Sequence, residues 1–405
     1  MSKKKLGLLP KLIIAIILGI AVGMVAPEKL IAIFATFNDI FNEFLGFVIP
    51  LIIIGFVVPG IADLGDGAGK ILAITALIAY VSTIISGSVA YFVDMASFPS
   101  FLEVGSIVFD NAQNAEETMV AGLFTIEMPA IMEVMSALIL SFTLGLGIAV
   151  TKAEGMKKIF NEFQDIVTKV IASIIIPLLP FHVFGIFSNL TFSGTVFEIM
   201  SVFIKVFGII ILLHICILIF QYVIAGVFAK KNPFALLKNM IPAYFTALGT
   251  QSSAATIPVT LEQTKKNGVR GEIADFVIPL CATIHLSGST ITLTSCALAI
   301  MMLNGIEISF ISILPFILML GVTMVAAPGV PGGAVMAALG VLETMLHFNP
   351  IMLNLMIALY IAQDSFGTAC NVTGDGAIAV LVDAIRGKGG KAKEAKEAKE
   401  AVSEN

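Results

Sequence analysis

Four polar residues share a stripe in an apolar region near the C-terminus: Asp364, Thr368, Asn371 and Asp375. Their spacing of i, i+4, i+7 and i+11 places them on one helix face. A carboxylate at the centre of a bilayer costs about 2.5–3.5 kcal/mol, and no Lys or Arg lies between positions 271 and 385 to balance two of them. The stripe predicts that ligands bring the counter-charges, a cation and an ammonium group. The alternative is a set of structural hydrogen bonds inside a helix bundle.

Catalysis is a second interpretation of the same carboxylates, because Gly374-Asp375 is similar to the Gly-Asp pair of intramembrane aspartyl proteases. That chemistry needs two carboxylates close enough to share a proton. Asp364 and Asp375 are 11 residues apart, which is about 16 Å along a helix. No other acidic residue occupies a suitable mid-span position. We therefore expect that the protein is not an enzyme.

Polar or Gly- and Pro-rich segments interrupt the apolar second half at four points: 251–253, 285–289, 328–333 and 371–375. The first has basic residues on both sides and a short second arm, which predicts a re-entrant hairpin entered from the cytoplasm. The third has no basic flanks and predicts a hairpin entered from outside. Each hairpin precedes a span in which we expect a polar break. Such repeated, inverted elements with interrupted helices are typical of secondary transporters.

The elements that carry these segments are predicted to be membrane-spanning helices. The 405 residues are 58% hydrophobic and 13% charged, with a mean hydropathy of +1.01, whereas soluble domains are about 25% charged. This composition excludes soluble enzymes and disordered scaffolds. The net charge of −5 and the lack of a basic stripe predict no nucleic-acid partner. The four cysteines lie in apolar runs without metal-ligand spacing, so we expect neither disulfides nor a zinc site.

Apolar runs of about 20 residues, long enough to cross a bilayer, predict eight spans. They lie at about 8–27, 36–62, 71–94, 129–151, 167–189, 200–229, 272–303 and 350–385. The predicted fold is an all-α polytopic membrane protein with eight transmembrane helices and two re-entrant helical hairpins.

The distribution of basic residues predicts the orientation. Lys3, Lys4 and Lys5 place the N-terminus inside, and Arg386 returns the last span to the same side. The acidic segment between Lys70 and Lys152 is then external. We expect a multi-pass protein of the cell inner (cytoplasmic) membrane, surrounded by lipid, with both termini cytoplasmic.

Four motifs resemble the dicarboxylate/amino acid:cation symporter family, the glutamate-transporter homologues. Residues 252–260 are similar to its inner-hairpin serine motif and residues 282–289 to its seventh-helix motif. Residues 329–333 are similar to its outer-hairpin tip and residues 371–375 to its eighth-helix motif. The resemblance implies a homotrimer in which each subunit moves a transport domain against a scaffold in an elevator-like motion.

The resemblance also implies a division of the chain into three parts. Residues 1–230 form six helices that serve mainly as scaffold and trimer contact, although those at 71–94 and 200–229 are candidates to move with the transport domain. Residues 231–386 form the transport core with both hairpins. Residues 387–405, which carry Lys-Glu-Ala repeats, form a charged cytoplasmic tail.

Substrate-binding roles carry over from the family by position. Asp364 matches the aspartate that holds the substrate amino group, and Thr368 and Asn371 match polar contacts to the substrate. Ser252 and Ser253, with the main-chain N–H groups of the inner tip, match the cradle for its carboxylate. The outer lid contains two matched residues, Gly329 and Val330.

Sodium ions are the implied cofactors. Asp375 and Asn371, together with carbonyls near Cys281 and His285, match one sodium site. The carbonyl of Thr283 with the outer-hairpin backbone matches another.

Two departures from the family pattern bear on specificity. The chain has two arginines, Arg270 and Arg386, both at membrane edges, and the positions where carriers of acidic substrates place an arginine look like Gly367 and Gln251. Because an unpaired buried carboxylate costs several kcal/mol, the substrate is predicted to be a small neutral amino acid (serine, threonine or alanine). We also expect Gly367 to leave room beside the substrate side chain. The sequence is closest in character to the serine/threonine:sodium symporters.

The second departure is Ser287 where the family usually has aspartate, and His285 where it usually has asparagine. These changes weaken the case for one family sodium site, and a histidine at this depth is able to carry a proton. The favoured interpretation is a neutral, hydrogen-bonded His285 in a site that uses fewer sodium ions.

The predicted function is therefore sodium-driven symport of a small neutral amino acid. The alternatives are a dicarboxylate or acidic amino acid carrier coupled to sodium or protons, and, from other classes, an ion channel or a non-transporting sensor.

Overall fold

The computed structural model describes residues 8–64, 69–105, 120–194, 196–325, 327 and 332–403. Every regular element in these ranges is helical, which confirms the all-α prediction. The α-helices are α1 Leu8–Val25, α2 Glu28–Leu64, α3 Gly69–Ser97, α5 Val134–Thr151, α6 Glu154–Val170, α7 Ile176–Phe192, α8 Val196–Ala229, α9 Pro233–Asn239, α10 Ile241–Thr250, α11 Ser253–Lys266, α12 Gly271–Ile284, α13 Ser287–Leu303, α14 Phe310–Val325, α15 Gly333–Leu346 and α16 Pro350–Ser403. Two short elements join them, the 3-10 helix η1 Phe98–Ser100 and the π-helix η2 Ile171–Ile175.

Six stretches of helix in the described residues are long and apolar enough to cross a membrane. They are Glu28–Ala62, Ile71–Ser100, Glu154–Phe192, Met200–Ala229, Gly271–Leu303 and Pro350–Arg386. The first and fourth predicted spans correspond to shorter apolar helices, α1 and α5, and both hairpin arms α14 and α15 are also short and apolar. The structure thus supports a polytopic integral membrane protein, while the count of eight spans stays a prediction.

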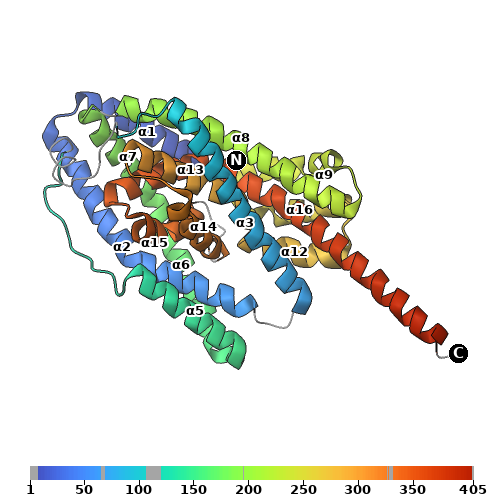
Figure 1. The fold of residues 1–405 in the computed structure, drawn as a ribbon. Coiled ribbons are helices and arrows are strands. Elements are labelled where there is room, and N and C mark those ends of the chain that lie inside the picture. The colour runs from blue at the N-terminus through green and yellow to red at the C-terminus, as the bar shows by residue number, and fades with distance from the viewer. Residues whose placement is uncertain are drawn as a thin grey trace, which may run out of the picture.

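The helices form two packed groups (Figure 1). In one group α2 packs on α5, α6 and α7, and α1 packs on α7. In the other, α16 packs on α8, α10, α11, α12 and α13, and α13 also packs on α3. The outer-hairpin arm α15 contacts both groups, because it packs on α16 and also on α2 and α5.

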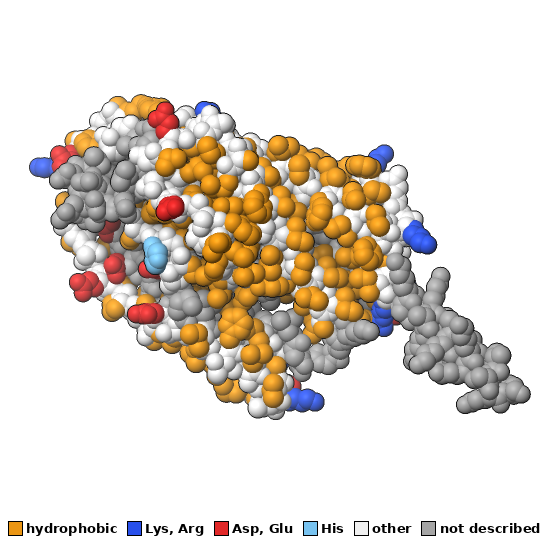
Figure 2. All heavy atoms as spheres, in the orientation of Figure 1, with side chains coloured by type: hydrophobic (Ala, Val, Ile, Leu, Met, Phe, Trp, Pro, Cys, Tyr) orange, Lys and Arg blue, Asp and Glu red, His pale blue; other side chains and the backbone are white. Residues whose placement is uncertain are grey.

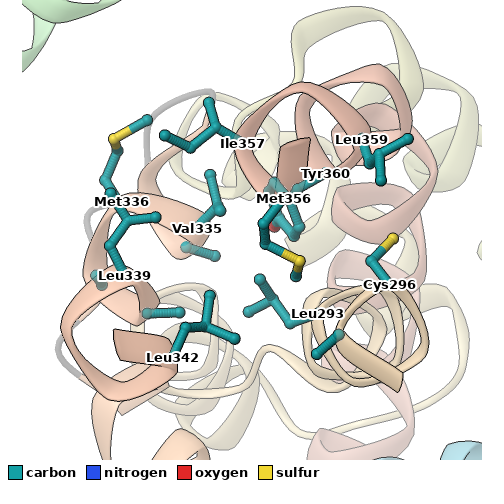
Figure 3. Close-up of a cluster of buried hydrophobic side chains, with 14 of the residues drawn as sticks. Leu293, Cys296, Val335, Met336, Leu339, Leu342, Met356, Ile357, Leu359 and Tyr360 are labelled. Atoms are coloured by element: carbon teal, nitrogen blue, oxygen red, sulfur yellow. The ribbon is translucent and has the colours of Figure 1, made fainter. Parts of the chain in front are cut away.

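Helix α13 is the centre of the second group, and all 17 of its residues are buried. Figure 3 shows Leu293 of α13 between Val335 of α15 and Met356 of α16, and Cys296 of α13 on the side towards Leu359 of α16. These side chains belong to one hydrophobic cluster. The close packing fixes α13, and therefore its N-terminus, against α15 and α16.

The inner hairpin has the predicted form. Helix α10 ends at Thr250, Gln251 takes a left-handed conformation with φ 54°, and α11 begins at Ser253. The Ser252 side chain caps α11 by accepting a hydrogen bond from Ala255 N. For the outer hairpin, the arms α14 and α15 pack on each other as predicted, but Gly329 and Val330 of its tip lie outside the described residues.

Of the two predicted helix breaks, one is confirmed and one is wrong. The chain leaves helical geometry at His285 and Leu286, between α12 and α13. Helix α16, in contrast, runs unbroken through Asn371–Asp375 and on to Ser403. Gly374 serves close packing there, since a Cβ on it would lie 2.6 Å from Gln221 Oε1 and 2.9 Å from His285 Cε1.

The charged residues gather at the two ends of the molecule (Figure 2). Asp and Glu dominate the left end of the view, Lys and Arg the right end near α9 and α12, and a mainly hydrophobic surface separates them. A transmembrane orientation with the basic end in the cytoplasm would give this distribution.

Candidate functional site

Asp364 of α16 lies where the outer hairpin meets the core. Its side chain is 5% exposed. Oδ2 accepts a hydrogen bond of 2.7 Å from the main-chain N–H of Gly332, and Oδ1 accepts one of 3.5 Å from the Thr368 hydroxyl. Gly332 has φ 75°, a conformation that favours glycine. The carboxylate is thus held by neutral donors, and none of the described Lys, Arg or His residues forms an ion pair with it.

The inner-hairpin tip lies at the same level along α16. Helices α10 and α16 are antiparallel neighbours: Met240 lies against Gly376, and Tyr244 lies near Cys370. Eleven residues separate Met240 from Gln251, about 16 Å of helix, which brings the tip level with Asp364. The predicted residues Ser252 and Ser253 begin α11 at this level, and the outer-hairpin arm contacts Asp364 directly through Gly332.

Asn371 has a structural task that the sequence did not predict. Its Oδ1 accepts hydrogen bonds from the main-chain N–H groups of Gly288 (2.8 Å) and Ser289 (3.3 Å), and its Nδ2 donates to Ser289 Oγ (2.9 Å). Asn371 therefore caps the N-terminus of α13 from a different helix. Whether it also contacts substrate or sodium stays a prediction.

Asp375 lies one helical turn further along and has a different kind of partner. Its Oδ1 is 2.9 Å from His285 Nδ1, and the side chains of His285 and Asp375 are 0% and 1% exposed. We predicted that ligands alone balance both carboxylates of the stripe, because Lys and Arg are lacking in this region. At Asp375 the structure adds a hydrogen-bonding partner, an imidazole 90 residues earlier in the chain, while a ligand as the source of the counter-charge stays a prediction.

Two residues that the sequence did not indicate complete the surroundings of His285. Ser82 Oγ of α3 is 3.1 Å from His285 Nε2. The amide Nε2 of Gln221, on α8, donates to Ser82 Oγ (3.0 Å) and to Ser287 Oγ (3.2 Å). Their polar side chains in apolar spans were the available signal. The network ties α3 and α8 to the α12–α13 break.

Of the predicted sodium ligands, four gather and one stands apart. Cys281 is buried and its carbonyl accepts from His285 N, so it joins His285, Asn371 and Asp375 around the break. Thr283 is exposed, and its hydroxyl donates to the carbonyl of Leu280 in its own helix. Thr283 was assigned to the second sodium site, so its position outside this cluster leaves that prediction open.

Gly288 lets α13 and α16 approach closely, because a Cβ on it would lie 2.5 Å from Gly367 O. A Cβ on Gly367 would meet the backbone of Gly288 and Ser289 at 3.5–3.6 Å, an ordinary van der Waals contact. The room that Gly367 leaves beside the substrate side chain stays a prediction.

The arginine nearest to this region is held elsewhere. Arg270 Nε donates to Asp383 Oδ1 at 2.7 Å. Asp383 lies 19 residues beyond Asp364 on α16, about 28 Å along the helix. Arg270 therefore offers no guanidinium for a second substrate carboxylate.

A model of the sodium:dicarboxylate symporter family matches residues 8–385. The chain belongs to this family. It is 25% identical over 394 residues to a serine/threonine transporter, SstT, of Acinetobacter baumannii strain ATCC 17978, a match that covers 94% of this chain and 97% of the relative. The SstT protein of A. baumannii strain SDF is 26% identical and that of Acinetobacter baylyi 25% identical, with the same coverage.

As a symporter, the protein offers two chemically distinct carboxylates in one buried region. Asp364 has an anionic side chain beside two hairpins and a neutral set of donors, which suits an ammonium group. Asp375 has carbonyl, amide and hydroxyl oxygens nearby, which are the donors that hard cations prefer. The family assignment makes the protein a membrane transporter, and the geometry indicates where its cargo could bind.

Proposed function

We propose that this symporter uses the sodium gradient to take up a small neutral amino acid, with serine and threonine as the preferred substrates. The observation that carries the proposal is Asp364, a buried carboxylate that contacts the outer hairpin, lies level with the inner-hairpin tip, and has only neutral hydrogen-bond partners in the described chain. The names of its SstT relatives, at 25–26% identity, support the choice of substrate.

In this proposal Asp364 binds the substrate ammonium and Thr368 supports the carboxylate from the next turn. Ser252, Ser253 and the N-terminus of α11 bind the substrate carboxylate, because a helix N-terminus favours an anion. Gly329 and Val330 close the site from the outer hairpin. Gly367 stands where carriers of acidic substrates place an arginine, so this position offers no guanidinium and leaves room beside the substrate side chain.

Sodium is proposed to bind beside Asp375, with Asn371 and the carbonyls of Cys281 and His285 as further ligands. A second sodium site at the Thr283 carbonyl is proposed from the family resemblance. The neutral form of His285 suits the first site, because Ser82, which accepts from Gln221, can then donate its own proton to His285 Nε2.

The proposal extends to assembly and motion. A homotrimer with an elevator-like movement would use the group of α1, α2, α5, α6 and α7 as scaffold, and the α13–α16 group as the moving part. The separate packing of these groups, with α15 between them, supports this division. Cross-linking of the membrane-embedded protein should give trimers, and monomers at every cross-linker concentration would contradict the assembly.

Uptake into proteoliposomes tests the function. Labelled serine should accumulate above its external concentration under an inward sodium gradient, and an equal potassium gradient should give no accumulation. Excess threonine should compete, whereas aspartate and succinate should not. Succinate or aspartate competition equal to that of threonine would favour the dicarboxylate alternative, and passage without accumulation would favour a channel.

A further inference from the structure

Asp94 is a buried carboxyl that the proposed transport site does not use. It lies near the end of α3 with 0% exposure, and apart from an interaction with the Ser295 side chain its oxygens have no hydrogen-bond partner among the described residues. It lies 12 residues beyond Ser82 on the same helix, about 18 Å away. An ionisable group at membrane depth is costly, so an unpaired one indicates a functional site. Asp94 is thus separate from the cluster around Asp375.

The register of α3 against α13 shows what Asp94 faces. Ser82 contacts His285, and Gly87 lies against Thr290, so the two helices run in parallel. Asp94 continues this register to Ser295, whose side chain faces its carboxyl. Cys296, the next residue of α13, lies in the cluster with α15 and α16 (Figure 3). Ser295, about 100° around the helix from it, is on the flank that is free to face α3.

Buried polar atoms with few partners lie at this level. The hydroxyls of Ser295 and of Thr294, its neighbour in sequence, are buried. Beyond the interaction between the Asp94 carboxyl and the Ser295 side chain, these hydroxyls and the two Asp94 oxygens have no hydrogen-bond partner among the described residues. Buried polar groups in proteins are almost always paired, so this group of atoms indicates a ligand.

The local electrostatics indicate the sign of that ligand. Asp94 lies in the last turn of α3, which ends at Ser97, and the C-terminus of a helix carries a partial negative charge. No described Lys, Arg or His forms an ion pair with Asp94. A cation is therefore favoured both by the carboxylate and by the end of the helix.

We propose that Asp94 and Ser295 bind a sodium ion between α3 and α13, with the Thr294 hydroxyl as an adjacent donor. Carboxylate and hydroxyl oxygens are ligands of hard cations, and a single carboxylate matches a single positive charge. The proposal rests on sodium as the coupling ion of the proposed function and adds an ion site that is distinct from the one at Asp375.

Binding of radioactive sodium to the purified full-length protein, without amino acid, tests the site. The asparagine in Asp94→Asn keeps the shape and removes the charge, so the variant should bind one sodium ion fewer per chain than the wild type. Ser295→Ala should keep the fold and weaken the affinity of one ion several-fold. The double variant Asp94→Asn/Asp375→Asn should lose one more ion than Asp94→Asn alone, because the two sites are separate.

An Asp94→Asn variant that binds sodium with the wild-type number and affinity overturns the proposal, and Asp94 then holds only a proton. Unchanged sodium binding by Ser295→Ala would equally exclude Ser295 as a ligand, which keeps the test decisive if Asp94→Asn does not fold. Failure of sodium-driven serine uptake by the wild type would contradict the proposed function instead. The sodium-binding experiment does not depend on serine uptake. Failure of the proposed function and failure of the Asp94 site are therefore distinguishable.

Discussion

Asp364 and Asp375 lie on one face of α16, yet their partners differ in kind. Asp364 accepts from the main chain of Gly332, at the start of the hairpin arm α15. Asp375 pairs with the side chain of His285, which Ser82 holds from α3. A partner on a hairpin leaves when the hairpin moves, whereas a side chain inside the core stays. This difference fits exchange of an amino acid at Asp364, whereas Asp375 keeps its hydrogen bond to His285.

Removing the charge of Asp364 should have the largest effect. Asp364→Asn should weaken serine binding by at least about 100-fold, because loss of one member of a buried ion pair costs about 3–5 kcal/mol. Serine-dependent thermal stabilisation and equilibrium binding measure this. The matched control is Asp383→Asn on the same helix, whose ion pair with Arg270 is partly exposed and should leave serine binding intact. Equal serine affinity in Asp364→Asn and the wild type would remove Asp364 from the substrate site.

Removing the charge of Asp375 should change the sodium response instead. Asp375→Asn should weaken sodium binding about 10- to 100-fold, since a hydrogen bond or contact to a charged group is worth about 1.5–3 kcal/mol. Serine affinity at saturating sodium should fall less than in Asp364→Asn. Sodium titrations of serine binding measure both quantities. If the sodium concentration at half-maximal serine binding is the same in Asp375→Asn and the wild type, Asp375 is not a sodium ligand. The assignment of sodium to Asp375 and serine to Asp364 would then be wrong.

The close approach of α13 and α16 keeps the two carboxylates in position, and a pair of glycine substitutions tests it. Gly288→Ala would place a Cβ 2.5 Å from Gly367 O, whereas Gly367→Ala meets its neighbours at 3.5 Å or more. Overpacking costs about 1–3 kcal/mol, so Gly288→Ala should lower the melting temperature and Gly367→Ala should lower it far less. Similar melting temperatures for both variants would contradict the packing that the structure shows.

Removing a hydrogen-bonding side chain near His285 should have the smallest effect. Gln221→Leu removes the hydrogen bonds to Ser82 and Ser287, each worth about 0.5–1.5 kcal/mol, and should weaken sodium affinity up to about tenfold. Cys216→Ala, an exposed position on the same helix, is the control and should behave as wild type. A serine affinity that falls while the sodium affinity is unchanged would assign Gln221 to the Asp364 region.

The sequence predicted the elements whose signals are local. Lys238 and Lys265 flank the inner hairpin, and the polar run at His285 indicated the break before α13; both features are present in the structure. The stripe from Asp364 to Asp375 lies on one helix as its spacing required. Charge placement and periodicity are properties of neighbouring residues, so they can be read without the fold.

What the sequence did not predict depends on contacts between distant segments. Gly374 resembled a helix break but serves the close approach of Gln221 and His285. The Asp375–His285 pair joins residues 90 positions apart, and its support from Ser82 comes from the first half of the chain. Gly288 similarly owes its role to the backbone of Gly367 on another helix. None of these partners is determined by spacing along one element.

Asp364 as the partner of a substrate ammonium is the central claim, and one binding measurement addresses it directly. Serine and 3-hydroxypropionate differ only in that the second has a hydrogen in place of the amino group. In saturating sodium the purified protein should bind serine and stay unresponsive to 3-hydroxypropionate at 100-fold higher concentration, since roughly 3–5 kcal/mol of pairing is lost. Comparable affinity for the two compounds would contradict the account.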